Sequence, residues 1–261
     1  MAQVKLNVFS INDFEAILKG LVRIIDSAAI EVGPKGLKIS ANAESKIRAF
    51  IKSDCIKMES DDLEDSVTLS FESIANLIKM VAFVKDIGQV SEECEFECDG
   101  VFIRFKGKGS IKLKLDKYEL IERFVSAPIK SELKDLFCFN MTSEVIKKIL
   151  SYSTFNTNYE VKLYFYIKNG VLMCDIDDKK EMAGRLSCVS IPVTEKYKGI
   201  LEKPFILDLE DMKKFNIFEQ PVIKCCLTDK CLKIASDFTS TLKNKEQVST
   251  TMMAIVRLLK D

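Results

Sequence analysis

Three aspartates in the second half of the chain form the arrangement that most resembles a catalytic metal site. Asp175, Asp177 and Asp178 form an acidic cluster with the pattern D-x-D-D, where x is any residue. Alternate residues of a strand share a face, so two of these carboxylates could hold Mg²⁺ for phosphoryl transfer. The cluster continues directly into the charged residues 179–181, however, which is typical of a solvated hairpin turn. A magnesium-dependent phosphoryl-transfer enzyme is therefore the weaker alternative.

The sequence lacks the other short motifs that mark common catalytic sites. The chain has no histidine, which excludes Ser-His and Cys-His nucleophile systems and removes the commonest general base near neutral pH. It has neither a P-loop nor a GxGxxG motif. The segment 107–109 lacks the upstream glycine and the following helix of a phosphate-binding loop. We therefore expect a protein that is not an enzyme and needs no cofactor.

The nine cysteines are spread singly through apolar stretches, apart from the neighbours Cys225 and Cys226. No CxxC pair exists. Cys94 and Cys98 would share one face of a strand, but two thiolates are too few for a zinc site. We expect the cysteines to be reduced, small core residues of a protein in an intracellular, reducing compartment.

The composition is that of an ordinary globular protein. Apolar residues make up 47% and charged residues 30% of the 261 residues. The apolar stretches are strand-sized and interrupted by Lys or Asp, so we expect neither a membrane span nor an apolar signal core. The formal net charge is zero. Any surface for nucleic acid must therefore come from the way in which the charges are distributed.

The order of predicted elements repeats in the two halves of the chain. Each half is predicted to run strand, helix, two or more strands, helix and further strands. An apolar stripe from Phe14 to Ile25 predicts the first helix, and Asn169 with Gly170 predicts a hairpin turn in the second half. We predict an α+β fold with two copies of one domain, at residues 1–117 and 136–261, joined by a connector at 118–135. The other three helices are predicted near residues 73–84, 142–150 and 210–215.

Basic side chains lie on the side of each predicted helix that its apolar stripe leaves exposed. A single Lys at such a position usually has no function beyond solvation, but the pattern recurs on all four helices. Lysine is a flexible point charge, so scattered lysines would attract the phosphates of duplex DNA without fixing a register. We therefore predict one continuous basic surface for DNA, with sheet faces that are neutral to acidic. Its members are Lys19, Arg23, Lys79, Lys85, Lys147, Lys148, Lys213 and Lys214.

Several segments occur in the order of the elements of a clamp. Residues 14–21 with 36–40 are similar to its first helix and hairpin, and residues 70–79 to its second helix. Residues 140–145 are similar to the entry to its second domain, and residues 252–256 to its last strand. In these segments the chain resembles DNA sliding clamps of the proliferating cell nuclear antigen and bacteriophage type. The resemblance implies a ring of six domains, with helices lining the hole and sheets outside, which a two-domain chain completes as a homotrimer. It also implies four kinds of partner: duplex DNA bound without sequence preference, a DNA polymerase, a clamp loader and other proteins with clamp-binding peptides.

The resemblance also assigns two sets of contact residues. The strands that pair between subunits would contribute Ile111, Leu113 and Leu115 from one chain, and Leu186 and Cys188 from the next. A clamp-fold transcription cofactor or scaffold that does not encircle DNA remains an alternative, which ring closure would distinguish. The second set is a pocket for partner peptides beside the connector, formed by Ile47, Ala49, Val125, Pro128, Ile129, Cys231, Met253, Ala254 and Ile255.

Overall fold

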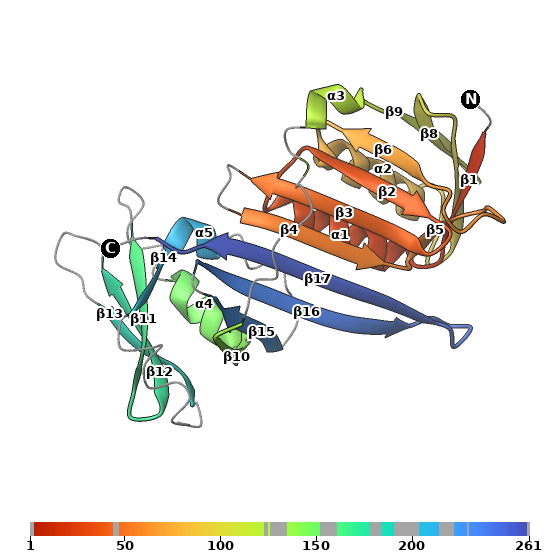
Figure 1. Cartoon of the computed structure of the whole chain (residues 1–261). Helices are drawn as coiled ribbons and strands as arrows, with labels where there is room; N and C mark the ends of the chain where they lie inside the picture. The colour runs from red at the N-terminus through yellow and green to blue at the C-terminus, as the bar shows by residue number, and fades with distance from the viewer. Residues whose placement is uncertain are drawn as a thin grey trace. The chain divides into compact units, whose positions relative to one another are not determined.

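A computed structural model gives the fold of the chain (Figure 1). It describes residues 3–43, 47–122, 125, 135–151, 161–177, 184–190, 204–213, 222–228 and 230–259. The chain divides into two compact units, in which Met1–Pro128 and Asp237–Met252 form unit 1, and Ile129–Ser236 and Met253–Asp261 form unit 2. The division at Pro128 falls inside the predicted connector, and the predicted domain limits at 117 and 136 stay a prediction.

Unit 1 contains two sheets. Its strands are β1 Val4–Val8, β2 Ala28–Gly33, β3 Gly36–Ala43, β4 Ile47–Ser53, β5 Ile56–Met58, β6 Val67–Phe71, β7 Cys94–Cys98, β8 Phe102–Lys106 and β9 Ser110–Lys114. One sheet has the order β5-β1-β7-β8-β9. In the other, β4-β3-β2-β6 is continued beyond β4 by β17 (Gln247–Arg257). Buried and exposed residues alternate along β3 and β4, so this sheet has one face turned to the core.

Two helices cover the core side of unit 1 and pack against each other (Figure 1). The first, α1 (Ile11–Val22), begins after Ser10, whose hydroxyl accepts a hydrogen bond from the Asp13 N–H at 3.2 Å and so caps the helix. The second is α2 (Ile74–Asp86), and a single turn, α3 (Tyr118–Ile121), follows β9. No helix in the described part of the chain is long and apolar enough to cross a membrane. The main helices bury Phe14, Ile17, Leu18 and Leu21 of α1, and Ile74, Leu77, Met80, Val81 and Val84 of α2.

Unit 2 also combines sheets with short helices. Its further elements are β10 Phe137–Thr142, α4 Ser143–Ser151, β11 Lys162–Lys168, β12 Val171–Asp177, β13 Gly184–Ser190, β14 Phe205–Asp208, α5 Leu209–Lys213, β15 Val222–Leu227 and β16 Cys231–Thr241. One sheet has the order β13-β12-β11-β14, and the other begins β10-β15-β16. Asn169 and Gly170, with φ of 53° and 74°, join β11 to β12 as a two-residue turn. The predicted hairpin is thereby confirmed.

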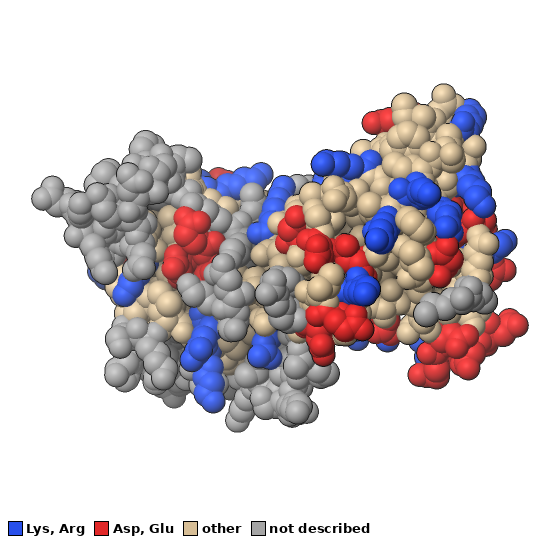
Figure 2. All heavy atoms as spheres, turned by 90° about the horizontal axis from the view of Figure 1, so that it is seen from above, with Lys and Arg blue, Asp and Glu red and all other residues tan. Residues whose placement is uncertain are grey.

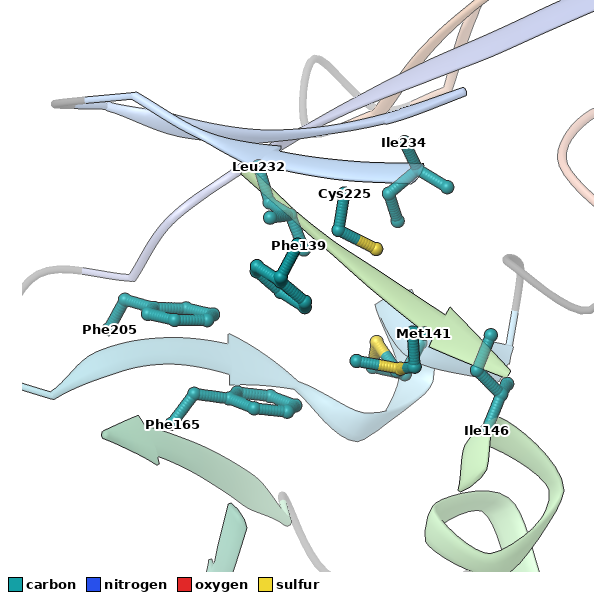
Figure 3. Close-up of a pocket in the computed structure, with 9 residues that line it drawn as sticks. Phe139, Met141, Ile146, Phe165, Phe205, Cys225, Leu232 and Ile234 are labelled. Atoms are coloured by element: carbon teal, nitrogen blue, oxygen red, sulfur yellow. The ribbon is translucent and has the colours of Figure 1, made fainter. Parts of the chain in front are cut away.

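Aromatic rings fill the core of unit 2. Phe165 and Phe205 stack with ring centroids 4.9 Å apart, and Phe139 lies 6.5 Å from Phe205. These rings, with Met141 and Ile146, surround a small apolar pocket (Figure 3). The described side chains that line it are buried and include no charged or amide group. Because a ligand site ordinarily has a few such groups to orient its ligand, we assign this pocket to the core.

The hairpin of β16 and β17 contributes its outer half, Asp237–Met252, to unit 1. Within that unit the Lys243 N–H donates a hydrogen bond to the Glu92 carboxylate at 2.9 Å. The buried hydroxyls of Ser53 and Thr250 are hydrogen-bonded at 2.7 Å, so neither is left unsatisfied in the core. Residues 237–252, from the second half of the sequence, are therefore part of the fold of unit 1.

Two of the nine cysteines are not reduced, which corrects the expectation from the sequence. Cys138 and Cys226 form a disulfide. They lie directly opposite each other on the antiparallel strands β10 and β15, with Cα atoms 4.1 Å apart, and this pairing brings the two sulfurs together. By contrast, Cys55 and Cys225 are free thiols in the core, and burial raises the pKa of each to about 12. Buried thiols of this kind are ordinarily unreactive.

Candidate nucleic-acid interface and subunit edges

The helices of unit 1 expose cations on the side opposite their apolar stripes. Lys19 of α1, Arg23 at its C-cap and Lys79 of α2 are all exposed. Lys85, in the last turn of α2, is half-buried. The helix-face cations predicted for unit 1 therefore come from two helices that are in contact with each other.

A single carboxylate binds two of these cations. Glu15 of α1 lies 2.7 Å from the Lys19 ammonium and 2.6 Å from that of Lys85, and its side chain is 13% exposed. Burial by itself would raise the pKa of Glu15, but the hydrogen bonds and charges of Lys19 and Lys85 outweigh it and hold the pKa below its ordinary value. Glu15 therefore stays ionised at neutral pH and offsets part of the positive charge of the helix face.

The corresponding cations of unit 2 are described only in part. Lys147 and Lys148 are exposed on α4, and Lys148 forms an ion pair with Glu144 at 2.8 Å. Lys213 ends α5, but its side chain and the whole of Lys214 lie outside the described residues. How far the predicted basic surface continues in unit 2 therefore stays a prediction.

The exposed face of the β3–β4 sheet is basic, so the expectation of neutral to acidic sheet faces is wrong for this part of unit 1. Lys38, Arg48 and Lys52 all point to the side away from the core. Lys38 and Lys52 are direct cross-strand neighbours, and Glu31 on β2 lies 3.5 Å from the Lys38 ammonium. Figure 2 likewise shows Lys and Arg interspersed with Asp and Glu on the face seen from above. Cations are therefore exposed on this sheet face as well as on the helices of unit 1.

Two strands predicted to pair between subunits are open sheet edges. In the described part of the chain, β9 pairs only with β8, and β13 pairs only with β12. Along β9, the half-buried Ile111 and Leu113 alternate with the exposed Lys112 and Lys114, and Leu115 beyond the strand is buried. Leu186 and Cys188 lie on β13, although the structure does not describe their side chains.

The residues predicted for the peptide pocket are divided between the units. In unit 1, Ile47 and Ala49 are buried on β4, and Val125 forms a β-bridge with Ala41 of β3, which places part of the connector against that strand. In unit 2, Met253 is half-buried. Most of the described candidates are thus core side chains in this structure. The remaining residues of the set are Cys231, Ala254 and Ile255, which are buried, and Pro128 and Ile129, which lie outside the described residues.

The acidic cluster considered for magnesium is described only in part. The Tyr166 hydroxyl donates hydrogen bonds to the Asp175 carboxylate at 3.2 Å, so that aspartate is bound to a neighbouring strand. The Asp177 side chain and Asp178 lie outside the described residues. In the part of the chain that the structure describes, the potential ligands close enough to share an ion are Asp135, Cys138 and Cys226, and two of these form the disulfide.

These elements define the class of fold: the chain is an α+β protein with the duplicated domain of a DNA sliding clamp. It is similar over its full length to the proliferating cellular nuclear antigen of Entamoeba histolytica, at 11% identity, with 100% of each chain covered and a TM-score of 0.69. A chain of the PCNA2–PCNA3 complex of Sulfolobus tokodaii is similar at 13% identity, with 97% of this chain and 98% of that chain covered and a TM-score of 0.59.

A third similar structure is the PCNA of A. fulgidus with the C-terminal region of FEN-1 bound, at 11% identity, 99% coverage of both chains and a TM-score of 0.66. No protein-family model matches the sequence, and no curated protein matches it. At these identities the similarity establishes the fold alone.

Proposed function

We propose that the chain is a non-enzymatic sliding clamp for DNA replication. Three copies form a ring around duplex DNA and tether a DNA polymerase and other replication proteins to it, inside the cell. The observation that carries this proposal is the pair of open edges on one chain, β9 at the end of one sheet and β13 at the end of another.

Two different open edges favour a closed ring. If β9 of one chain pairs with β13 of the next, the contact is head to tail, and repetition around a rotation axis closes a ring in which every β9 and every β13 is paired. The half-buried Ile111 and Leu113 would then be covered by the neighbouring strand. Pairing in this way also protects an apolar edge that would otherwise promote aggregation.

The helix face would bind DNA through its phosphates. The exposed cations on the helices of unit 1 are Lys19, Arg23 and Lys79. Contacts from these side chains to phosphates would read no bases, so we expect binding that is independent of sequence and strongly dependent on salt. Partner proteins would dock by short apolar peptides beside the connector, where Val125 pairs with Ala41 on β3. A loader that opens the ring would be required for a closed clamp to reach circular DNA.

The assembly and its topology can be tested together. We expect light scattering to give the mass of a trimer, and the loaded protein to remain on nicked circular DNA but to leave the same DNA once it is cut into a linear form. A monomer at all concentrations would contradict the ring and favour a clamp-fold scaffold. A trimer released equally from circular and linear DNA would contradict encirclement.

Replacement of Glu15 by Gln is expected to strengthen DNA binding. The substitution removes the carboxylate that lies within 2.7 Å of two helix-face ammonium groups. The helix face then carries one more net positive charge, so the slope of log K against log salt should steepen by about one unit for duplexes of any sequence. Fluorescence anisotropy at several salt concentrations measures this change.

Glu31→Gln is the matched control, because it removes a carboxylate that pairs with Lys38 on the sheet face. It should leave DNA affinity unchanged. If Glu31→Gln strengthens binding as much as Glu15→Gln does, DNA is attracted by overall charge rather than by the helix face. Thermal melting of both variants checks that the half-buried Glu15 site still folds.

A further inference from the structure

The disulfide of unit 2 lies on an accessible face of a sheet. Cys138 is exposed, whereas Cys226 is buried. The strand that carries Cys138, β10, is the first in the order β10-β15-β16 and has no second strand partner in the described part of the chain. Because Cys138 is exposed, a group arriving from solvent can reach its side chain, while that of Cys226 is buried.

Charged groups surround this disulfide. Lys233 of β16 lies opposite Cys226, and its ammonium is 2.6 Å from a carboxylate oxygen of Asp135. An oxygen of that carboxylate lies within 4.8 Å of both sulfurs, so the Lys233–Asp135 ion pair is adjacent to the bridge. Lys224 is exposed two residues before Cys226 on the same face of β15, about 7 Å along the strand.

We propose that Cys138 and Cys226 form a thiol-exchange site, at which an anionic low-molecular-weight thiol of the glutathione class forms a mixed disulfide with Cys138. The exposed Lys224 attracts a carboxylate of the incoming thiol. The ammonium of Lys233 stabilises the thiolate that forms on Cys226. This attraction outweighs the repulsion between that thiolate and the Asp135 carboxylate. The site belongs to unit 2 alone and does not depend on ring formation or on DNA.

The exchange balances without a metal or a further oxidant. The thiolate of the small molecule attacks Cys138 Sγ, and the electron pair of the protein S–S bond leaves on Cys226, whose thiolate can take up a proton from water. A second small thiolate then attacks the small-molecule sulfur of the mixed disulfide and releases Cys138 as a thiolate. The overall reaction turns two small thiols and the protein disulfide into a small-molecule disulfide and two protein thiols.

The fold permits both redox forms. β10 and β15 are paired from Phe137 with Leu227 to Thr142 with Val222, so backbone hydrogen bonds keep the two cysteines opposite each other after the bridge opens. The pair can therefore close again without refolding. The deeply buried Cys225, on the opposite face of β15, is shielded from the same reagent.

The test uses the oxidised full-length chain, treated with glutathione and then with an alkylating reagent, and analysed by peptide mass spectrometry. We expect a transient glutathione adduct on Cys138 and none on Cys226, followed by alkylation of both. With oxidised glutathione, Cys226→Ser should gain one adduct at Cys138, whereas Cys138→Ser should gain none at Cys226. An adduct on Cys226, or a bridge that glutathione does not open in the folded protein, would overturn the proposal.

Two lysine variants separate anion recognition from general reactivity. Lys224→Gln should slow exchange with glutathione about two- to fivefold, as expected for loss of one exposed ion pair, and leave exchange with the uncharged 2-mercaptoethanol unchanged. Lys233→Gln should slow exchange with both thiols, because it acts on the leaving thiolate. Equal rates of glutathione exchange in the wild type and Lys224→Gln would refute the anionic site. Thermal melting checks that both variants remain folded.

Discussion

Leu113→Asp is expected to convert the proposed trimer into monomers. Leu113 is a half-buried side chain on the open edge β9, and the proposed ring would cover it with β13 of the next chain. Replacing it removes apolar burial and puts an unpaired carboxylate into the contact, which together should cost at least about 3 kcal/mol per interface, or more than roughly 100-fold in Kd. Light scattering over a range of concentrations measures the loss, and retention on nicked circular DNA should disappear with it.

Leu63→Asp is the matched control for this substitution. Leu63 is 60% exposed in the loop between β5 and β6, away from the open edge. The same change of side chain there should leave both the trimer and DNA retention intact. A trimeric Leu113→Asp protein would show that β9 is not a subunit edge, whatever the assembly of the wild type.

Reduction of the Cys138–Cys226 disulfide should strongly lower the free energy of unfolding of unit 2. The bridge joins residues 88 positions apart, and opening a loop of that length restores chain entropy worth about 4–5 kcal/mol to the unfolded state. Hydrogen exchange is the suitable measurement because it reports each unit separately. Buried strands β11 and β15 should exchange much faster after reduction, whereas β7 and β8 in unit 1 should change little.

The double variant Cys138→Ala with Cys226→Ala supplies the reference for that experiment. It should exchange like the reduced wild type and should not respond to reductant, since Cys55, Cys98 and Cys225 are already free. Equal protection of oxidised and reduced wild type would show that the bridge does not constrain the unfolded chain. A response of the double variant to reductant would assign the effect to other thiols.

The local features of this fold were predictable from the sequence because their signals are local. The apolar stripe that starts at Phe14 predicts α1, and Asn169 with Gly170 predicts the turn between β11 and β12. The long hairpin was missed. Leu232 to Ala235 was the only stretch of β16 with an apolar pattern, because Ser236–Thr241 is rich in polar residues and becomes a strand only through its pairing in the tertiary structure.

The candidate surfaces were predictable to a smaller extent. Exposure of Lys19 and Lys79 follows from helical periodicity, and Glu15 stands four residues before Lys19, a spacing that indicates an ion pair. Nothing in the sequence relates Glu15 to Lys85, which is 70 positions away. The cross-strand pairing of Cys138 with Cys226 could not be predicted from the sequence either, because the register between strands far apart in the chain depends on the whole sheet.

The hairpin that completes unit 1 also determines when this protein can finish folding during its synthesis. Ser53 and Thr250 are 197 positions apart, so β4 has no β17 beside it until the residues of β17 have left the ribosome. Contacts of such high sequence separation form slowly. In the nascent first half, β4 is therefore an unpaired sheet edge. Such an edge can associate with other nascent chains, and it is a defined strand that chaperones could bind and protect.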